Sequence, residues 1–348
     1  MAIASSGAVS FSDLRTEFVG GSSAISYSDL YRGGSNIRAK ASNNTGVNLA
    51  ATVPTSGAIN IANFRSQAKG FRFTFTSGAT NQSAATLFGD DYAVDYPKDI
   101  VINSGVELGA TSTAEEALEI PSGGAGTITI TNNGTLSGYG GAAGSAGGDA
   151  FESAVSCTFV NNGTVRAGGG GGGTGGTGGN GSYSSVSYTF INFSTYMAIY
   201  ASGCRPLVNG SYQGSHVTHN NANGSVCPNG YGYYVGSPVY SSKYYIGIPS
   251  TSSTSGGAGG AGGVGQGYGV SAGSGSSGAS GGTNAGTGGA GGAGGSFGAA
   301  GSTGSTGANG NSTNGSAGSS GGSAGKYNRV SGGTLTFTNN GTVQGNAP

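Results

Sequence analysis

The chain has little charge and no long apolar run. Only 7% of its 348 residues are charged, and 13 basic residues balance 13 acidic ones. There is therefore no basic stripe with which a nucleic-acid-binding domain would neutralise phosphates. No segment reaches the roughly 18 apolar residues of a membrane-spanning helix, and the first residues lack the basic and apolar regions of a secretory signal peptide. The sequence predicts no nucleic-acid partner, no membrane insertion and no signal peptide.

Acidic residues are missing from the second part of the chain. All 13 lie at or before Glu152, so residues 1–152 carry 8 − 13 = −5 and residues 153–348 carry +5. Glycoside hydrolysis ordinarily needs a pair of carboxylates, and neither a nucleophile–base pair nor a phosphate-binding loop stands out. We therefore predict two parts with different roles, and no enzyme.

Cysteine is also scarce, with three residues in the chain, which excludes a disulfide scaffold. Cys157 begins a strand-like segment and is expected to be a small buried apolar residue. Cys204 and Cys227 leave three alternatives open: a disulfide, free thiols, or a zinc site with His216 and His219. The pattern lacks the short Cys-x₂₋₄-Cys pair that is typical of structural zinc, so we predict no metal and no other cofactor.

The N-terminal part contains three copies of one short unit, at 6–15, 22–31 and 56–65. Each alternates apolar and polar residues as a half-buried strand does, and in the first two copies Ser12 or Ser28 is expected to cap a short helix. Such short helices are unstable alone, so the units must pack together as a cap domain, dock on a larger assembly, or do both. The docking hypothesis names eight contact residues: Phe11, Leu14, Arg15, Tyr27, Leu30, Tyr31, Phe64 and Arg65.

A strand motif ending in Asn-Asn-Gly-Thr recurs at 127–138, 157–166 and 335–345, with a looser copy at 100–106. Segment 71–76 places three phenylalanines on one face, as in a strand that lies over a core. Asn-Gly between alternating strands favours a hairpin, but only two or three extended residues follow it here. The repetition therefore indicates stacked strand–turn–strand coils, and the late third copy indicates that the intervening chain leaves the stack and returns.

Glycine supplies 77 of the 348 residues, about 22% against roughly 7% on average, and it recurs with period three. Residues 172–180 read Gly-Gly-Thr, Gly-Gly-Thr, Gly-Gly-Asn, and 256–264 and 288–296 are similar. Period three favours an extended helix that rises about 3.1 Å per residue. Collagen is excluded because none of the eight prolines lies in a glycine run. We predict a bundle of polyglycine-II rods, with Gly-Gly-X rods inside and Gly-X-X rods at the edge; a flexible Gly/Ser linker is the alternative.

Residues 183–249 interrupt the glycine runs and contain 11 of the 18 tyrosines. Recognition residues concentrate in segments carried by a rigid scaffold, and tyrosine offers large contact area with little rotamer entropy. Tyrosine and asparagine together suit sugar rings and their hydroxyls, although the tyrosines also suit a core of the insertion itself. The candidate receptor-binding residues are Tyr212, Tyr231, Tyr233, Tyr234, Tyr240, Tyr244, Asn209, Asn221 and Asn229.

The opening at 6–18 and the Tyr-Arg-Gly-Gly at 31–34 resemble the N-termini of virion proteins of tailed bacteriophages. The strand motif that runs into glycine-rich segments resembles phage tail-fibre and tail-tip adhesins, similar in kind to the distal adhesin of T-even-type long tail fibres, a polyglycine-II sandwich whose end loops read the host surface. The resemblance implies a receptor-binding virion protein on the tail, made in the host cytoplasm. It implies two partners, other tail-fibre proteins and a host glycan or outer-membrane protein.

These observations predict a mainly β fold with a polyglycine-II bundle. The expected parts are virion-attachment repeats at 1–70, a β-strand layer at 71–137, the bundle at 138–333 with its insertion at 183–249, and a closing strand at 334–348. Three similar N-terminal units could also let one chain bind a three-fold fibre as a monomer. One alternative is a purely structural virion protein (whisker, collar or decoration). A more remote one is an ice-binding protein, which needs a regular row of threonines; Thr174 and Thr177 begin such a row, but Asn180 ends it.

Overall fold

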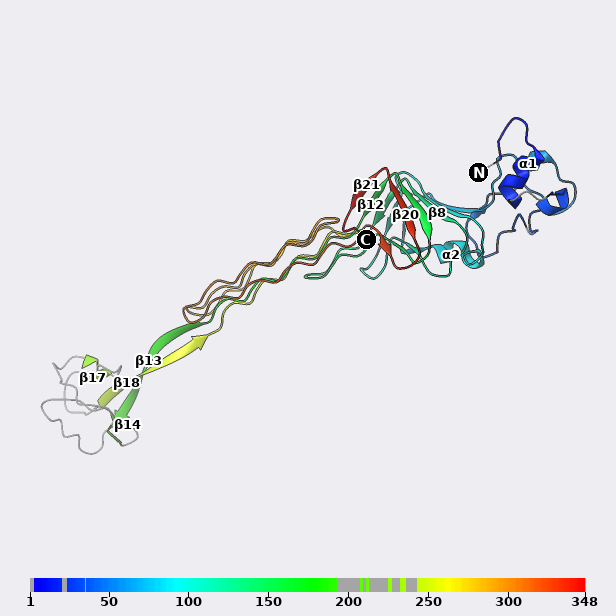
Figure 1. Cartoon of the computed structure of the whole chain (residues 1–348). Helices are drawn as coiled ribbons and strands as arrows, with labels where there is room; N and C mark the ends of the chain where they lie inside the picture. Colours follow the sequence, from blue (N-terminus) through cyan, green and yellow to red (C-terminus); the bar gives the residue numbers. More distant parts are fainter. Residues whose placement is uncertain are drawn as a thin grey trace.

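In the computed structural model the chain is elongated, with four parts in succession: an N-terminal domain, a three-sided β-helix, a glycine-rich bundle and a two-stranded ribbon (Figure 1). The structure describes residues 3–20, 24–34, 36–192, 207–208, 211–212, 225–226, 232–235 and 243–347. Among them no helix is both long and apolar enough to cross a membrane.

The N-terminal domain is built from short helical turns around a small core. Its elements are α1 (Phe11–Leu14), η1 (Arg15–Val19), η2 (Tyr27–Leu30), β1 (Val47–Asn48) and η3 (Ile61–Phe64). The core consists of eight buried residues: Ile3, Leu14, Phe18, Leu30, Ile37, Ala50, Val53 and Phe64. Since none of these turns could persist alone, the shared core is what stabilises them.

The β-helix follows and has five coils of parallel strands. Two short helices, α2 (Ala84–Phe88) and η4 (Gly89–Asp91), lie between the first and second coils. The first coil contains β2 (Phe71–Phe75), β3 (Ala79–Thr80) and β4 (Gln82–Ser83), and the second contains β5 (Lys98–Ile102), β6 (Glu107–Gly109) and β7 (Leu118–Ile120). The third contains β8 (Ile128–Asn132), β9 (Thr135–Ser137) and β10 (Phe151–Ser153), and the fourth contains β11 (Cys157–Asn161), β12 (Thr164–Arg166) and β19 (Arg329–Val330). The fifth contains β20 (Leu335–Asn339) and β21 (Thr342–Gln344).

Equivalent strands of successive coils pair in parallel and form three sheets, with the orders β2-β5-β8-β11-β20, β4-β7-β10-β19 and β3-β6-β9-β12-β21. Strand β1 of the N-terminal domain pairs antiparallel with β2 and extends the first sheet. The register aligns the repeated motif, so that Phe159 of β11 lies beside Ile130 of β8 and Phe337 of β20. Alternate residues of each strand point inward, which gives the buried core of the β-helix. The third copy of the motif, β20 and β21, pairs with β11 and β12 of the second copy.

The first asparagine of each motif forms a ladder inside the β-helix. The side-chain amide of Asn132 donates to Oδ1 of Asn161 at 2.8 Å, and that of Asn161 donates to Oδ1 of Asn339 at 2.7 Å. Asn132 and Asn161 are fully buried. Because a buried amide must be hydrogen-bonded, this ladder explains why the motif requires asparagine at the corner of the coil.

The glycine-rich segments are insertions at one corner of two successive coils. Residues 138–148 lie between β9 and β10, and residues 167–325 lie between β12 and β19. The prediction of one continuous bundle over 138–333 is therefore wrong, because 151–166 belongs to the β-helix. The segment predicted as one domain contains two insertions that leave the β-helix, and between them the chain returns to the β-helix once.

In the bundle, extended segments lie side by side and exchange backbone hydrogen bonds at every third residue. The N–H of Gly172 donates to the carbonyl of Gly263 at 2.7 Å, and the N–H groups of Gly175 and Gly178 donate to the next two equivalent carbonyls of the same neighbour at 2.8 Å each. Within the described residues of 138–325, φ is positive only at Gly144, Gly269, Asn284 and Gly298, which lie at the reversals between segments.

A long antiparallel ribbon leaves the far end of the bundle (Figure 1). It pairs β13 (Gly181–Asn192) with β18 (Lys243–Thr254) over their whole length. The short strands beyond it are β14 (Leu207–Val208), β15 (Ser211–Tyr212), β16 (Ser225–Val226) and β17 (Gly232–Val235). The side-chain amides of Asn284 and Asn311 both donate to the carbonyl of Ser182, at 3.0 and 2.9 Å. These bonds attach the ribbon to the bundle at its base.

Candidate functional site

The three N-terminal units share one cap geometry. In the first, the N–H of Ser10 donates to the carboxylate of Asp13 at 2.7 Å and the Ser10 hydroxyl accepts from the N–H of Asp13 at 3.2 Å. Ser26 and Asp29 repeat this capping box, and in the third unit the N–H of Asn60 donates to Oδ1 of Asn63 at 2.8 Å. The predicted caps Ser12 and Ser28 are thus wrong by two residues. The side chain that satisfies the first N–H groups of the turn must precede the turn.

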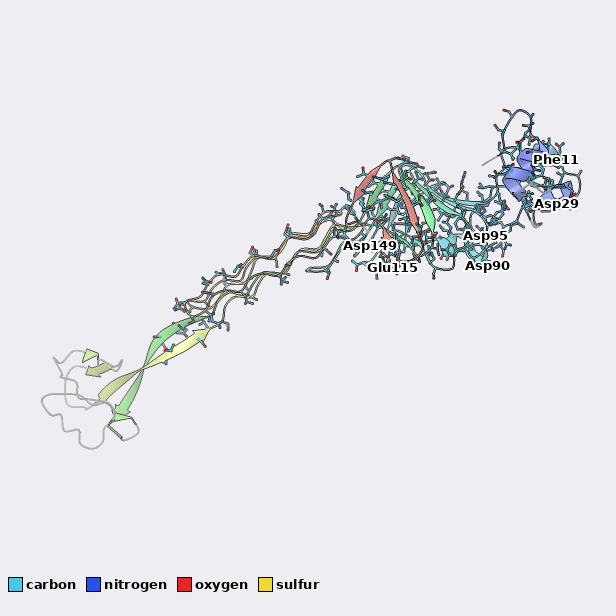
Figure 2. All side chains as sticks on the ribbon, viewed as in Figure 1. Phe11, Asp29, Asp90, Asp95, Glu115 and Asp149 are labelled. Carbon is cyan, nitrogen blue, oxygen red and sulfur yellow. The ribbon has the colours of Figure 1, made fainter. Side chains whose placement is uncertain are left out.

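Hydrogen bonds to the backbone lower the pKa of both cap carboxylates. For Asp13 the main cause is the N–H of Ser10, followed by the Ser10 hydroxyl, and for Asp29 it is the N–H of Ser26, followed by its hydroxyl. Both aspartates therefore stay charged at neutral pH on the surface of the domain. Figure 2 places Asp29 and Phe11 at the end of the molecule opposite the ribbon.

The eight predicted docking residues divide into two groups. Leu14, Leu30 and Phe64 are fully buried in the shared core. The prediction that they contact a partner is therefore wrong, because these apolar side chains pack the three units against one another. Phe11 is 39% exposed, and Arg15, Tyr31 and Arg65 are half-buried. The side chain of Tyr27 lies outside the described residues.

A buried carboxylate connects the N-terminal domain to the β-helix. Asp91 accepts from Nε of Arg38 at 2.9 Å, from the N–H of Ala41 at 2.7 Å and from the side-chain amide of Asn44 at 2.9 Å. Burial disfavours its charge, but these donors outweigh burial and lower the pKa of Asp91. The domain is thus held to the β-helix by a charged group with three donors, a connection that no sequence pattern indicates.

Arg329 anchors the chain where it returns from the bundle. Its guanidinium contacts the carboxylates of Glu116 and Glu152, the latter at 2.5 Å, and Asp149 at 3.1 Å. Burial, and then the charge of Glu152, raise the pKa of Glu116 to about 7. Three carboxylates around one guanidinium leave an excess of negative charge at this junction.

Tyr244, one of the candidate receptor-binding residues, lies on ribbon strand β18, and the others lie between the two ribbon strands in the sequence. Tyr212, Tyr233, Tyr234 and Tyr244 fall on β15, β17 and β18, but their side chains are outside the described residues. Tyr231, Tyr240, Asn209, Asn221 and Asn229 are themselves outside the described residues, as are Cys204, Cys227, His216 and His219. In the described ranges, no three His, Cys, Asp or Glu side chains are grouped to hold a metal ion. Cys157 is a buried free thiol, as predicted.

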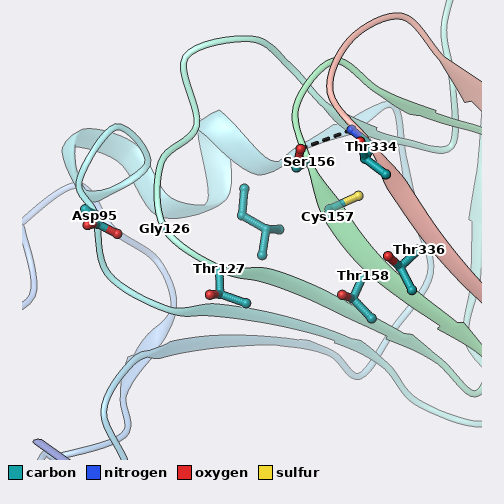
Figure 3. A pocket seen from close by; sticks show the side chains of 9 residues that line it. Asp95, Gly126, Thr127, Ser156, Cys157, Thr158, Thr334 and Thr336 are labelled. Atoms are coloured by element: carbon teal, nitrogen blue, oxygen red, sulfur yellow. Dashed lines mark hydrogen bonds between the residues drawn. The ribbon is translucent and has the colours of Figure 1, made fainter. Parts of the chain in front are cut away.

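A shallow polar pocket of about 390 Å³ lies on the β-helix (Figure 3). It is lined by hydroxyl groups of successive coils, including Thr127, Thr158 and Thr336, with Asp95 at one side. The Ser156 hydroxyl accepts from the N–H of Thr334 at 3.0 Å, so part of this polar surface serves the coil itself. The residues that line the pocket include no charged pair and no nucleophile–base arrangement. The pocket is therefore a polar part of the β-helix surface and not a candidate catalytic site.

Comparison with protein families identifies the chain. The model of the phage tail fibre adhesin Gp38 matches residues 59–248, more than half of the sequence. The chain belongs to the Gp38 family of phage tail fibre adhesins. This adhesin is a virion protein of the phage tail, and the predicted resemblance is confirmed.

Among solved structures, the adhesin is similar to a chain in the crystal structure of the gp37–gp38 adhesin tip complex of the bacteriophage S16 long tail fibre. The two are 16% identical, the match covers 84% of this chain and 88% of that chain, and the TM-score is 0.34. The comparison with curated proteins gave no match.

Proposed function

We propose that this adhesin attaches to the tip of a tail fibre through its N-terminal domain and binds a host surface glycan or outer-membrane protein through the segment beyond its ribbon. The observation that carries the proposal is the separation of the two candidate sites. The N-terminal domain and the ribbon lie at opposite ends of an elongated molecule (Figure 1). Such a shape suits a protein that bridges two partners.

The glycine-rich segments are, in this proposal, polyglycine-II rods that give the bridge its stiffness. Support comes from the three-residue period of their hydrogen bonds and from the restriction of positive φ to the reversals. A rod of 12 residues would span about 37 Å. Segment 167–180 donates to or accepts from 141–148, 257–266, 286–295, 298–308 and 312–325, as expected for a Gly-Gly-X rod inside the bundle.

The charge distribution supports a binding role for the far end. Residues 153–348 contain no carboxylate side chain, so an anionic bacterial surface would not repel the tip through acidic side chains. The proximal acidic residues lie beyond the bundle, and at physiological ionic strength charges are screened over about 8 Å. The tip therefore interacts with the surface independently of the negative N-terminal part.

Competition for adsorption tests this function. Purified full-length chain should occupy the host receptor and slow adsorption of the parent phage. A variant in which a short turn replaces residues 186–249 keeps the base of the ribbon and should lose this effect. Phe11→Asp, which changes only the opposite end, should compete as well as the wild type. Equal slowing of adsorption by the shortened variant would mean that receptor binding lies elsewhere in the chain, and failure of the wild-type chain to compete would instead indicate a purely structural virion protein.

A further inference from the structure

Segment 167–180 joins the ribbon directly to the β-helix, and we infer that it has a mechanical function: it carries the tension between the two ends of the molecule, and Arg166 fastens it to the β-helix. This inference rests on the proposed function, in which one end is held by the fibre and the other by the cell. It adds the path that a pull on the tip follows through the chain.

The two ribbon strands enter the bundle differently. The segments of the bundle run between the β-helix and the ribbon (Figure 1), and segment 167–180 connects β12 of the β-helix to β13 without a reversal. Strand β18 continues into 255–266, but the chain then turns back at 267–270, where Gly267 and Val270 form an isolated antiparallel bridge. From there it reaches the β-helix again only at β19, after several reversals. A pull on the ribbon therefore passes directly into the β-helix through 167–180.

Segment 167–180 has little length to release under tension. In the proposed polyglycine-II form each residue rises about 3.1 Å, whereas a fully extended chain rises about 3.3–3.6 Å per residue. The segment can therefore lengthen by only about 3–7 Å before its covalent backbone is taut. An α-helix with the same number of residues, at about 1.5 Å per residue, would lengthen by roughly 25–30 Å.

The neighbouring segments prevent this segment from sliding. Each residue from 167 to 180 donates its backbone N–H to another segment of the chain. On one side, Gly173 and Gly176 donate to the carbonyls of Ser302 and Ser305, each at 2.9 Å. Such bonds lie across the direction of the pull, so sliding must break them together, and the next equivalent register is three residues or about 9 Å away. The neighbours therefore share the tension.

Arg166 lies where segment 167–180 leaves the β-helix. Its Nε donates to the hydroxyl of Ser137 at 2.8 Å, and its Nη2 donates to the carboxylate of Glu107 at 2.8 Å. These partners belong to β9 and β6, so the side chain joins three successive coils. Its Cζ also lies 3.8 Å from the centre of the Phe297 ring, at a reversal of the bundle, which is a cation–π contact. One side chain thus ties the exit point to both the β-helix and the bundle.

The charge pattern of the chain agrees with this role. Arg166 is the first basic residue after Glu152, the last acidic one. It pairs with Glu107 where 167–325 leaves the β-helix, and Arg329 pairs with Glu116 and Glu152 where that segment returns. Hydrogen bonds between charged groups are roughly twice as strong as neutral ones. The basic residues at both attachments of the bundle therefore hold it to carboxylates of earlier coils.

Single-molecule pulling of the full-length chain tests this function. Azide-bearing residues in place of Ser104, exposed in the turn after β5, and Ser184, exposed on β13, provide handles that do not react with cysteine. The wild type should hold at a fixed force without an early lengthening step from 167–180. Arg166→Met removes the guanidinium but keeps an unbranched side chain, and it should shorten the lifetime at that force about tenfold or more, because hydrogen bonds of a charged group are lost.

Two controls separate tension from general stability. Arg72→Met removes a comparable contact, from Arg72 to Asp99 at 2.8 Å, on a strand outside the pulled part of the β-helix, and it should leave the lifetime unchanged. When the handles replace Ser42, exposed in the N-terminal domain, and Ser104, the load does not pass through Arg166. In that geometry Arg166→Met should have no effect. Circular dichroism should show that both variants fold.

The outcomes separate this inference from the proposed function. An unchanged lifetime of Arg166→Met between Ser104 and Ser184, equal shortening in both pulling geometries, or lengthening of 167–180 at low force like a flexible chain would each overturn the mechanical function. These results would leave the competition for adsorption intact. Failure of the wild-type chain to compete would overturn the bridge between fibre and cell, and with it the tension that this segment is inferred to carry.

Discussion

Replacing Gly289 by alanine should destabilise the glycine-rich bundle much more than replacing its neighbour Ala290 by serine, although each change adds one heavy atom. Gly289 is buried and Ala290 is exposed. A Cβ on Gly289 would overlap the carbonyl oxygen of Ser305 and lie 2.7 Å from its carbonyl carbon and 2.9 Å from that of Thr306. Carbon atoms need about 3.5 Å, so the neighbouring segment must move by roughly 1 Å.

That movement acts on three hydrogen bonds between the two segments. Ser302, Ser305 and Ala308 donate to the carbonyls of Ala293, Ala290 and Thr287, each at 2.8 Å. Loss of a bond costs about 1 kcal/mol and overpacking costs about 1–3 kcal/mol. We therefore expect Gly289→Ala to lower local stability by about 2–5 kcal/mol.

Amide hydrogen exchange measures this change directly. The amides of 302–308 should exchange about 30-fold to a few thousand-fold faster in Gly289→Ala than in the wild type, while Ala290→Ser should leave them unchanged. Equal protection in the two variants would mean that the segments are not packed backbone to backbone, and the proposed rod structure would be wrong.

Three further predictions concern the β-helix. Asn161→Ala should lower the free energy of unfolding by about 2–4 kcal/mol, because buried partners lose their hydrogen bonds, while the exposed Asn162→Ala should cost less than half as much; equal losses would refute the internal ladder. Lys98 is fully buried and its Nζ donates to the carbonyls of Val94, Tyr96 and Ala125 at 2.7, 2.9 and 2.7 Å, so Lys98→Met should destabilise the protein by about 2–5 kcal/mol in chemical denaturation, and a more stable variant would contradict this. The pKa of Glu116 is about 7 in the folded chain, above its ordinary 4.5; the folded state therefore binds more protons between these values, and the Glu116 contribution to stability falls as pH rises from 4.5 to above 7. Glu116→Gln should reduce the change in melting temperature between pH 5 and pH 8. An unchanged pH dependence would show that Glu116 does not cause it.

The repeated motifs made the β-helix predictable. Asn-Asn-Gly-Thr recurs in the last three coils because each of them turns at the same corner and its first asparagine continues the same internal ladder. The period of three in the glycine runs likewise matches hydrogen bonds that recur at every third residue. Wherever one physical requirement is repeated along the chain, the sequence displays it directly.

Features that occur once, or that depend on tertiary contacts, could not be predicted. The sequence predicts docking roles for Leu14 and Leu30 because a short amphipathic unit has the same pattern whether its apolar face covers a core or a partner. Arg329 and Glu152 are 177 residues apart in the chain, and the local sequence around Arg329 does not indicate its partners. Tyr268 packs over Gly109, where a Cβ would overlap the tyrosine ring. The sequence does not predict this contact either.

Electron cryotomography of phage particles adsorbed to host cells tests the central claim most directly, namely that this adhesin bridges a fibre and the cell with its two ends. We expect the N-terminal domain against the fibre tip, and the ribbon with residues 186–249 against the cell surface. The opposite polarity, or a molecule lying along the fibre with neither end at the cell, would contradict the account.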